Sequence, residues 1–312
     1  MHWKLKAKIQ NAISRLPPSV SYEIYYWVQR SFGAWGSFDT SSRLKAGIDM
    51  WNKIQEQGRN PSGKVFLEVG TGRVPLAPLA YWLMGAEKTI TIDVNPYVKQ
   101  ELIAESIRHI STNKDEIINL FGPLLNQERF HSLLEFCGAS QRPLSAYLDF
   151  FKVDYIASGN AADTHLPSQS IDFHTSYTVF EHIPEDVLKK ILKEGNRIIK
   201  EDGLFVHQID YGDHFSYSDK NISLINFLQY SDAEWEGYAG NRYMYMNRLR
   251  HDDFIKLFES AGQRIITAKP KVDQRVQALL KSGKMPLNER FSSKTEEVLA
   301  TVSAWMITQK IT

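Results

Sequence analysis

The sequence predicts an α/β fold with a doubly wound, mostly parallel sheet of seven strands, the last two of them antiparallel. Short apolar segments alternate with helical patterns between residues 64 and 209. Helical crossovers between successive strands impose parallel pairing, because a tight turn cannot join parallel neighbours. Two further apolar segments, 264–268 and 301–307, close the sheet as the antiparallel pair. This is a Rossmann-like architecture with helices on both faces.

The chain divides into an N-terminal cap and a larger domain. Residues 1–60 are helical in pattern, with aromatic side chains concentrated between residues 22 and 38. The turn signal Pro61-Ser62-Gly63 opens the domain of residues 61–312. The expected strands are 64–69, 88–92, 152–156, 171–176, 204–209, 264–268 and 301–307, and the expected helices are 75–84, 97–110, 185–200 and 252–261. Insertions at about 111–150 and 209–250 are expected to be helical. The aromatic side chains of the second could form a lid together with the cap, or they could be the packed core of a helical cap.

Charge and cysteine content exclude several classes of protein. The 37 Lys and Arg residues nearly balance the 36 Asp and Glu residues, so the formal net charge is +1. No global positive field attracts nucleic acid, and we expect no nucleic-acid partner. A single cysteine, Cys137, excludes an intrachain disulfide framework.

Targeting signals are weak. The longest apolar stretch, 75–86, is too short to span a bilayer and contains two prolines. The N-terminus lacks the continuous apolar core of a signal peptide, so we expect a cytoplasmic protein. Its alternating basic and apolar residues leave two interpretations open: peripheral contact with a membrane, or a helix laid over the protein's own core, which we favour.

The first strand ends in Glu68-Val69-Gly70-Thr71-Gly72. In such sheets ligands bind at the carboxyl ends of the strands. Two glycines spaced by one residue allow a tight turn and a close approach of backbone to ligand. Val74-Pro75 replace the third glycine of a dinucleotide fingerprint. A ligand without phosphates but with a positive group therefore suits Glu68 better.

The second strand ends at Asp93, about 20 residues after Gly72. A carboxylate at this place can accept both hydroxyls of a ribose. The alternative is a cap on the next helix, but Asn95 followed by Pro96 fills that role at least as well. We therefore expect Asp93 to bind a ribose.

Two more strand ends complete a pattern. Asn160-Ala161 and Leu166-Pro167 follow the third strand, while Ser170-Ile171-Asp172-Phe173 and Phe180-Glu181-His182-Ile183-Pro184 surround the fourth. Together with Glu68-Val69-Gly70-Thr71-Gly72 and Ile92-Asp93, these segments resemble the class I S-adenosylmethionine-dependent methyltransferases, with a type 11-like methyltransferase domain. The resemblance covers roughly residues 63–210 and rests on the order and the intervals of the segments.

The resemblance implies S-adenosylmethionine as the cofactor and S-adenosylhomocysteine as its product. It implies that Gly70 and Gly72 pass the methionyl part closely. Glu68 would fix their loop and face the ammonium group, and Asp93 would hold the ribose hydroxyls.

The resemblance also assigns the adenine and the sulfonium. Asn160, beside Ala161, stands where the family often has Asp to accept from the adenine amino group, and Asp163 is the alternative for that role. Tyr177 would lie along the cofactor near the sulfonium.

Four titratable residues, His207, Asp210, Asp213 and His214, leave the fifth strand at the mouth of the expected site. Three interpretations stay open. A His-Asp pair could take the proton of an acceptor hydroxyl, His and carboxylates could bind a divalent metal, or the segment could be a polar loop around a buried His.

Glu181-His182 is a second candidate for acceptor chemistry. In some related quinone-precursor O-methyltransferases a Glu-x-x-Glu-His run binds metal here, but Thr178 holds the first position in this chain. We therefore favour no metal, expect His182 to be a base or a wall residue, and expect Glu181 to cap the next helix.

Our interpretation is a methyltransferase that methylates oxygen on a small molecule or saccharide. The whole arrangement, with its N-terminal aromatic stretch, resembles bacterial methyltransferases of uncharacterised or glycan-related substrate. Proton removal is assigned to His214 or His182, with Asp210 orienting. The alternatives are an N- or C-methyltransferase of the same fold, a nicotinamide-dependent oxidoreductase, or a non-catalytic protein that binds S-adenosylmethionine. The sequence leaves the acceptor and the oligomeric state open.

Overall fold

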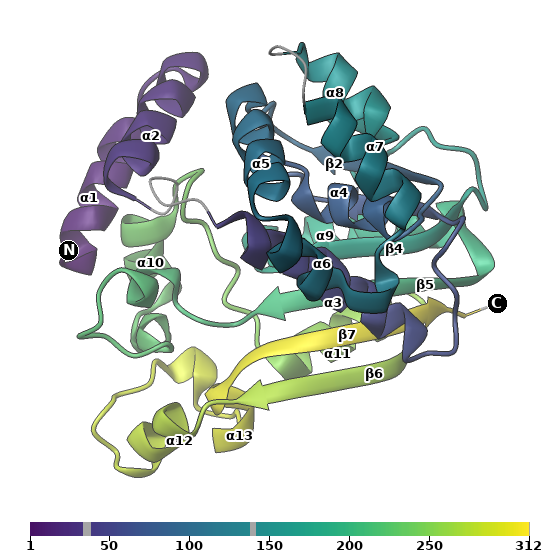
Figure 1. Cartoon of the computed structure of the whole chain (residues 1–312). Helices are drawn as coiled ribbons and strands as arrows, with labels where there is room; N and C mark the ends of the chain where they lie inside the picture. The colour runs from purple at the N-terminus through teal and green to yellow at the C-terminus, as the bar shows by residue number, and fades with distance from the viewer. Residues whose placement is uncertain (34–38, 138–141, 312) are drawn as a thin grey trace.

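The computed structural model describes residues 1–33, 39–137 and 142–311. At its centre is a seven-stranded sheet in the order β3-β2-β1-β4-β5-β7-β6 (Figure 1). The strands are β1 (Val65–Val69), β2 (Lys88–Asp93), β3 (Val153–Ala157), β4 (Ile171–Tyr177), β5 (Ile199–Asp210), β6 (Gln263–Val272) and β7 (Thr301–Lys310). Strands β1 to β5 pair in parallel, whereas β7 runs antiparallel to both β5 and β6. The predicted fold class is confirmed.

The central strands are buried along their polar as well as their apolar residues, as β4 (IDFHTSY) shows. All of β4 except its last residue is buried, because helices cover both faces of the sheet. At the sheet edge, β3 instead exposes Asp154. Strand β5 begins earlier than predicted, at Ile199 and not at residue 204, beside a register shift against β4.

Helices pack on the two faces in separate apolar cores. On one face lie α3 (Thr40–Gln55), α4 (Leu76–Leu83), α5 (Gln100–Thr112), α6 (Lys114–Phe121), α7 (Gln127–Cys137) and α8 (Leu144–Phe150). The other face holds α9 (Glu185–Ile198) and α11 (His251–Ser260). The first predicted insertion is thus helical and extends the core of the first face.

A third apolar core lies beyond the ends of β5 and β7. It joins α1 (Trp3–Ser14) to the second insertion, which contains η3 (His214–Tyr217), η4 (Asn226–Gln229) and α10 (Asp232–Ala239). The elements α12 (Gln274–Lys281), η5 (Glu289–Phe291) and α13 (Glu296–Ala300) follow β6. Figure 1 shows α1 and α2 (Pro18–Phe32) beside α10, away from the centre of the sheet.

The N-terminal helix lies over the protein's own core, as favoured from the sequence. Trp3 and Ala7 are buried against the second insertion. Part of the aromatic stretch, residues 34–38, lies outside the described residues. No described helix has both the length and the apolarity needed to cross a bilayer.

Candidate cofactor and acceptor site

A cavity of about 590 Å³ opens at the carboxyl ends of β1, β2 and β4. The strand order reverses there, since β1 lies between β2 and β4. The strand-end loops contribute Gly70, Thr71, Gly72, Arg73, Asp93, Asn95, Gly159, Asn160, Ala161, Tyr177, Thr178, Val179 and His182 to its lining. Helix α2 and the second insertion contribute Tyr25, Gln29, Arg242, Tyr243 and Tyr245.

The loop after β1 requires glycine at its first turn. Gly70 has a φ of +89°, and a Cβ atom there would lie 2.5 Å from Cγ2 of Val179. Its N–H donates to the carbonyl of Ile92 at 2.8 Å, which ties the loop to β2. The backbone therefore passes the cavity without a side chain in the way.

Asp93 is buried at the end of β2. Its carboxylate accepts the N–H of Gly72 at 3.0 Å and the N–H of Asn95 at 3.0 Å. Burial raises the pKa of Asp93, although these two hydrogen bonds act to lower it. Neither Asp93 nor Asn95 caps the next helix, because α5 begins at Gln100 behind an extended segment, so the expected helix start at Asn95-Pro96 is wrong. Each carboxylate oxygen keeps acceptor capacity toward the cavity.

Glu68 lies in a neighbouring cavity of about 460 Å³. Tyr177, Thr178 and the glycine loop line both cavities, so the two adjoin. Burial, helped by the negative charge of Asp93, raises the pKa of Glu68 to about 8. Arg43 of α3 also lines both cavities. Arg43 was not predicted as a site residue, because it lies on a helix within residues 1–60 and does not follow a strand.

The loop after β3 separates the two adenine candidates. Asn160 and Ala161 line the larger cavity, and Oδ1 of Asn160 accepts the N–H of Ala162 at 3.0 Å. The side chain of Asp163 is 64% exposed and lies 3.4 Å from His165. Asp163 lines neither described cavity.

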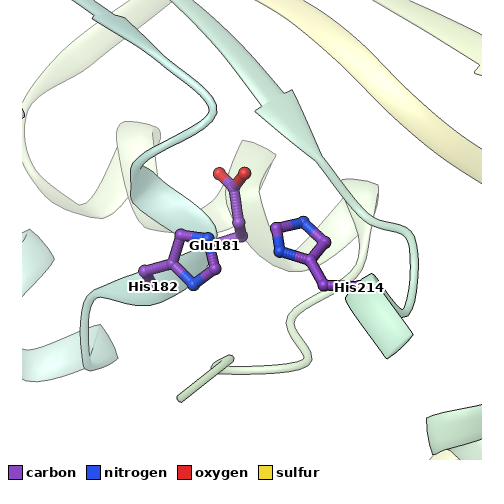
Figure 2. A group of neighbouring side chains, drawn as sticks. All are labelled: Glu181, His182 and His214. Atoms are coloured by element: carbon purple, nitrogen blue, oxygen red, sulfur yellow. The ribbon is translucent and has the colours of Figure 1, made fainter. Parts of the chain in front are cut away.

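Glu181, His182 and His214 form a compact cluster beside the larger cavity (Figure 2). One ligand atom of each lies within 4.8 Å of the others, and the two imidazole rings have centroids 4.8 Å apart. Burial and the neighbouring His214 lower the pKa of His182 to about 4. Burial and the nearby Asp210 raise the pKa of Glu181 well above its ordinary range. Glu181 does not cap α9, which has Pro184 at its N-cap, so that expectation is wrong.

The remaining polar residues after β5 divide into two kinds. Asp210 lies 3.4 Å from Nε2 of His214 and accepts hydrogen bonds from Tyr217 and from the N–H of Gly212. His207 and Asp213 are fully buried, with Ser176 and Asn226 as hydrogen-bond partners. These two residues line neither described cavity and fit the interpretation of a polar, structural segment.

Part of the chain matches a known protein family. The family model for a methyltransferase domain matches residues 137–207, which include Asn160, Tyr177 and His182. No curated protein matches the chain.

Solved structures of methyltransferases resemble this fold at low sequence identity. Geranyl diphosphate C-methyltransferase from Streptomyces coelicolor A3(2) is 8% identical, with a TM-score of 0.47 over 85% of this chain and 79% of that one. A TehB-like methyltransferase from Corynebacterium glutamicum is 13% identical, with a TM-score of 0.42 over 95% and 100%. A methyltransferase from Methanosarcina mazei is 14% identical, with a TM-score of 0.43 over 83% and 97%.

Proposed function

We propose that this protein, whose sheet has the class I topology, is an S-adenosylmethionine-dependent methyltransferase that methylates an oxygen atom of a small molecule or saccharide. The observation that carries the choice of oxygen is the pair of close imidazoles, His182 and His214, with Asp210 beside the second. A hydroxyl must lose its proton during transfer, so a positioned base accelerates the reaction. A neutral amine has no such need.

The residues of the two cavities fit S-adenosylmethionine, which supplies an activated methyl group on a sulfonium. Asp93 has free acceptor capacity for the ribose, and the glycine loop leaves a cradle that a Cβ at Gly70 would fill. Glu68 would face the ammonium group, and Arg43 offers a cation for the carboxylate of the methionyl part.

The adenine end would lie against the loop after β3. Asn160 and Ala161 contribute to the cavity there, whereas Asp163 faces solvent. We therefore prefer Asn160 over Asp163 for the adenine edge. Tyr177 borders both cavities, where it would contact the middle of the cofactor.

Proton removal would fall to the histidine pair. Nδ1 of His182 donates to the carbonyl of Tyr245 at 2.7 Å, so its Nε2 carries the lone pair. Asp210 would orient the ring of His214 from 3.4 Å. The hydroxyl proton would pass to one of these imidazoles and from there to solvent. His182 and His214 would also align the acceptor hydroxyl with the methyl group, which lowers the entropic part of the activation free energy.

Aromatic side chains support a ring-shaped or sugar-like acceptor. Tyr25 and Tyr97 border the cavity, as do Tyr243 and Tyr245 of the second insertion. Such rings stack on sugars and on aromatic molecules and exclude water.

Methyl transfer from labelled S-adenosylmethionine to panels of hydroxyl and amine acceptors tests this proposal. We expect a hydroxyl acceptor, and we expect His182→Gln or His214→Gln to lower kcat about 100-fold or more. The exposed His165→Gln is the matched control and should keep the wild-type rate. An amine acceptor with rates unchanged in all three variants would favour the N-methyltransferase, and cofactor binding without turnover would favour a non-catalytic protein.

A further inference from the structure

We propose that Glu181, His182 and His214 bind one divalent transition-metal ion. Glu181 and His182 lie in η2 (Phe180–His182) after β4, and His214 begins η3 after β5. Because β4 and β5 are neighbours, their exits bring these residues together, and Figure 2 shows the carboxylate between two imidazoles. The sequence motif of a metal-binding run is incomplete at Thr178, but His214 supplies a ligand from another segment.

The carboxylate of Glu181 points to a missing cation. The residue is only 2% exposed, and neither carboxylate oxygen has a hydrogen-bond partner among the described residues. Buried carboxylates are normally paired with a cation, hydrogen-bonded or bound to a metal. A cation between the three side chains would give this carboxylate a partner.

A hydrogen bond at His182 and a nearby carboxylate at His214 orient the two imidazoles. A carbonyl oxygen only accepts, so Nδ1 of His182 must donate to Tyr245, and Nε2 is left with a lone pair for an ion. The Asp210 carboxylate lies 3.4 Å from Nε2 of His214, which leaves Nδ1 of that ring for the ion. A carbonyl or carboxylate on the far nitrogen fixes the tautomer and the direction of a metal-bound imidazole.

The donor set selects the class of ion. Two imidazoles and one carboxylate suit Zn²⁺, Fe²⁺ or Co²⁺, whereas Mg²⁺ and Ca²⁺ prefer oxygen ligands. Three protein ligands leave at least one open position, which is the arrangement of catalytic rather than structural zinc sites. Since His182 also lines the larger cavity, a ligand in that cavity can reach the open position.

The consequence for catalysis rests on the proposed function. A hydroxyl oxygen on the ion loses its proton to bulk water more readily, because the ion lowers the pKa of that hydroxyl. The oxygen then bonds to the methyl carbon while the methyl–sulfur bond breaks, with its electron pair staying on sulfur. This ion-assisted route replaces the proton transfer to His182 or His214 described under the proposed function, while the hydroxyl acceptor stays the same.

Titration of the chelator-treated full-length protein with Co²⁺, followed by visible absorption and by displacement with Zn²⁺, tests the site. We expect one saturable Co²⁺ per chain. Glu181→Gln keeps the side-chain size but removes the anionic ligand, so its affinity should fall at least about 10-fold, as should that of His214→Gln. The control His131→Gln removes a 76% exposed imidazole that lies 3.2 Å from Glu135, and its affinity should be unchanged.

Binding of S-adenosylhomocysteine to the same preparations, measured by calorimetry, separates the two proposals and reports folding of the variants. Cofactor binding without saturable Co²⁺ binding would overturn the metal site alone. The site would also be overturned if Glu181→Gln and His214→Gln kept wild-type Co²⁺ affinity, or if His131→Gln lost it. Co²⁺ binding that depends on Glu181, in a protein that does not bind the cofactor product, would support the site and overturn the proposed function.

Discussion

The Asp93 carboxylate accepts one backbone N–H from Gly72 and one from Asn95. Asp93→Asn replaces one of these acceptor oxygens by an NH2 group that faces a donor, so one partly buried N–H loses its partner. Such a loss costs about 1–3 kcal/mol, and the ribose loses an acceptor as well. We expect the affinity for S-adenosylhomocysteine to fall about 10- to 100-fold by calorimetry.

Asp154→Asn is the matched control for this change. Asp154 belongs to the neighbouring strand β3, where it is exposed and pairs with Lys88 at 2.5 Å. Exposed ion pairs contribute little to stability, and Asp154 lines neither described cavity. Equal affinities for the two variants would remove the ribose role from Asp93.

Glu68 should make the free protein less stable as the pH rises. Burial raises its pKa from an ordinary 4.5 to about 8, so between these values the folded state keeps a proton that the unfolded state releases. The free energy of unfolding then falls by at most about 1.4 kcal/mol per pH unit in this window. Urea unfolding at about pH 6 and about pH 8 should show a steeper loss in the wild type than in Glu68→Gln.

Cofactor affinity should respond to the same group in the opposite direction. An ammonium group beside Glu68 favours the ionised carboxylate, so binding displaces its proton. We expect the affinity for S-adenosylhomocysteine to rise with pH up to about 8 in the wild type and to lack this rise in Glu68→Gln. Identical pH profiles of the two proteins would place the ammonium group elsewhere.

Side-chain partners limited what the sequence could predict at single residues. Their positions after strands led us to expect Gly70, Asp93 and Asn160 at one site, and all three line the larger cavity. The same argument could not decide whether Asn160 or Asp163 faces the cavity. That depends on the local turn, in which Oδ1 of Asn160 accepts the N–H of Ala162 and the side chain of Asp163 faces solvent. The unpartnered carboxylate of Glu181 was invisible for a similar reason, since its surroundings come from segments distant in the sequence.

The loop between β1 and α4 has room for no side chain at its first glycine. In Gly70→Ala, a left-handed backbone costs about 1–2 kcal/mol, and overlap of Cβ with Val179 at 2.5 Å adds about 1–3 kcal/mol. We expect a loss of about 2–5 kcal/mol in the free energy of unfolding, measured in urea.

Gly58→Ala is the control that isolates the backbone term. Gly58 has a φ of +70°, and nothing lies within 4 Å of the Cβ that would be added. Its loss should therefore stay near 1–2 kcal/mol. Adding Val179→Ala to Gly70→Ala should recover part of the larger loss in a double-mutant cycle. Equal losses at Gly58 and Gly70 without any recovery would rule out the overlap.

Strands were easier to predict than the starts of helices. A buried parallel strand is a short run of apolar residues between turn signals, and all seven segments are strands within a few residues of their expected bounds. Helix α5 begins at Gln100 and not near Tyr97, since hydrogen bonds among Asp93, Asn95 and Tyr97 shape the loop before it. Strand β5 extends back to Ile199 because it pairs with Ile171, which no local pattern reveals.

The three apolar cores divide the molecule into a sheet domain and a cap-and-lid unit. Two cores flank the sheet, and the third joins α1 to the second insertion. Helix α2 follows α1 and contributes Tyr25 and Gln29 to the larger cavity. The position of α1 therefore affects where α2 lies, and α2 forms one wall of the larger cavity. Helix α1 itself does not line that cavity.

Trp3 is the residue that anchors α1. It is 3% exposed, and its ring contacts Phe215, Tyr230, Trp235 and Tyr238. Its backbone N–H donates to the carboxylate of Asp219 at 2.9 Å. Trp3→Ala should cost this unit about 3–5 kcal/mol. Hydrogen exchange should then rise in α1, α2 and the second insertion but remain slow in β1 and β4. Affinity for S-adenosylhomocysteine should fall as the wall formed by α2 loosens.

Trp27→Ala separates anchoring from a general loss of aromatic surface. Trp27 lies on α2 and is 60% exposed, so its removal should change stability by no more than about 0.5 kcal/mol and leave hydrogen exchange unaltered. If Trp3→Ala accelerated exchange throughout the sheet, the cap and the sheet would unfold as one cooperative unit. If it accelerated exchange only in the cap and the lid while cofactor affinity stayed at the wild-type value, α2 would have no part in holding the cofactor. Faster exchange confined to the cap and the lid, together with weaker binding, is the outcome that the separate third core predicts.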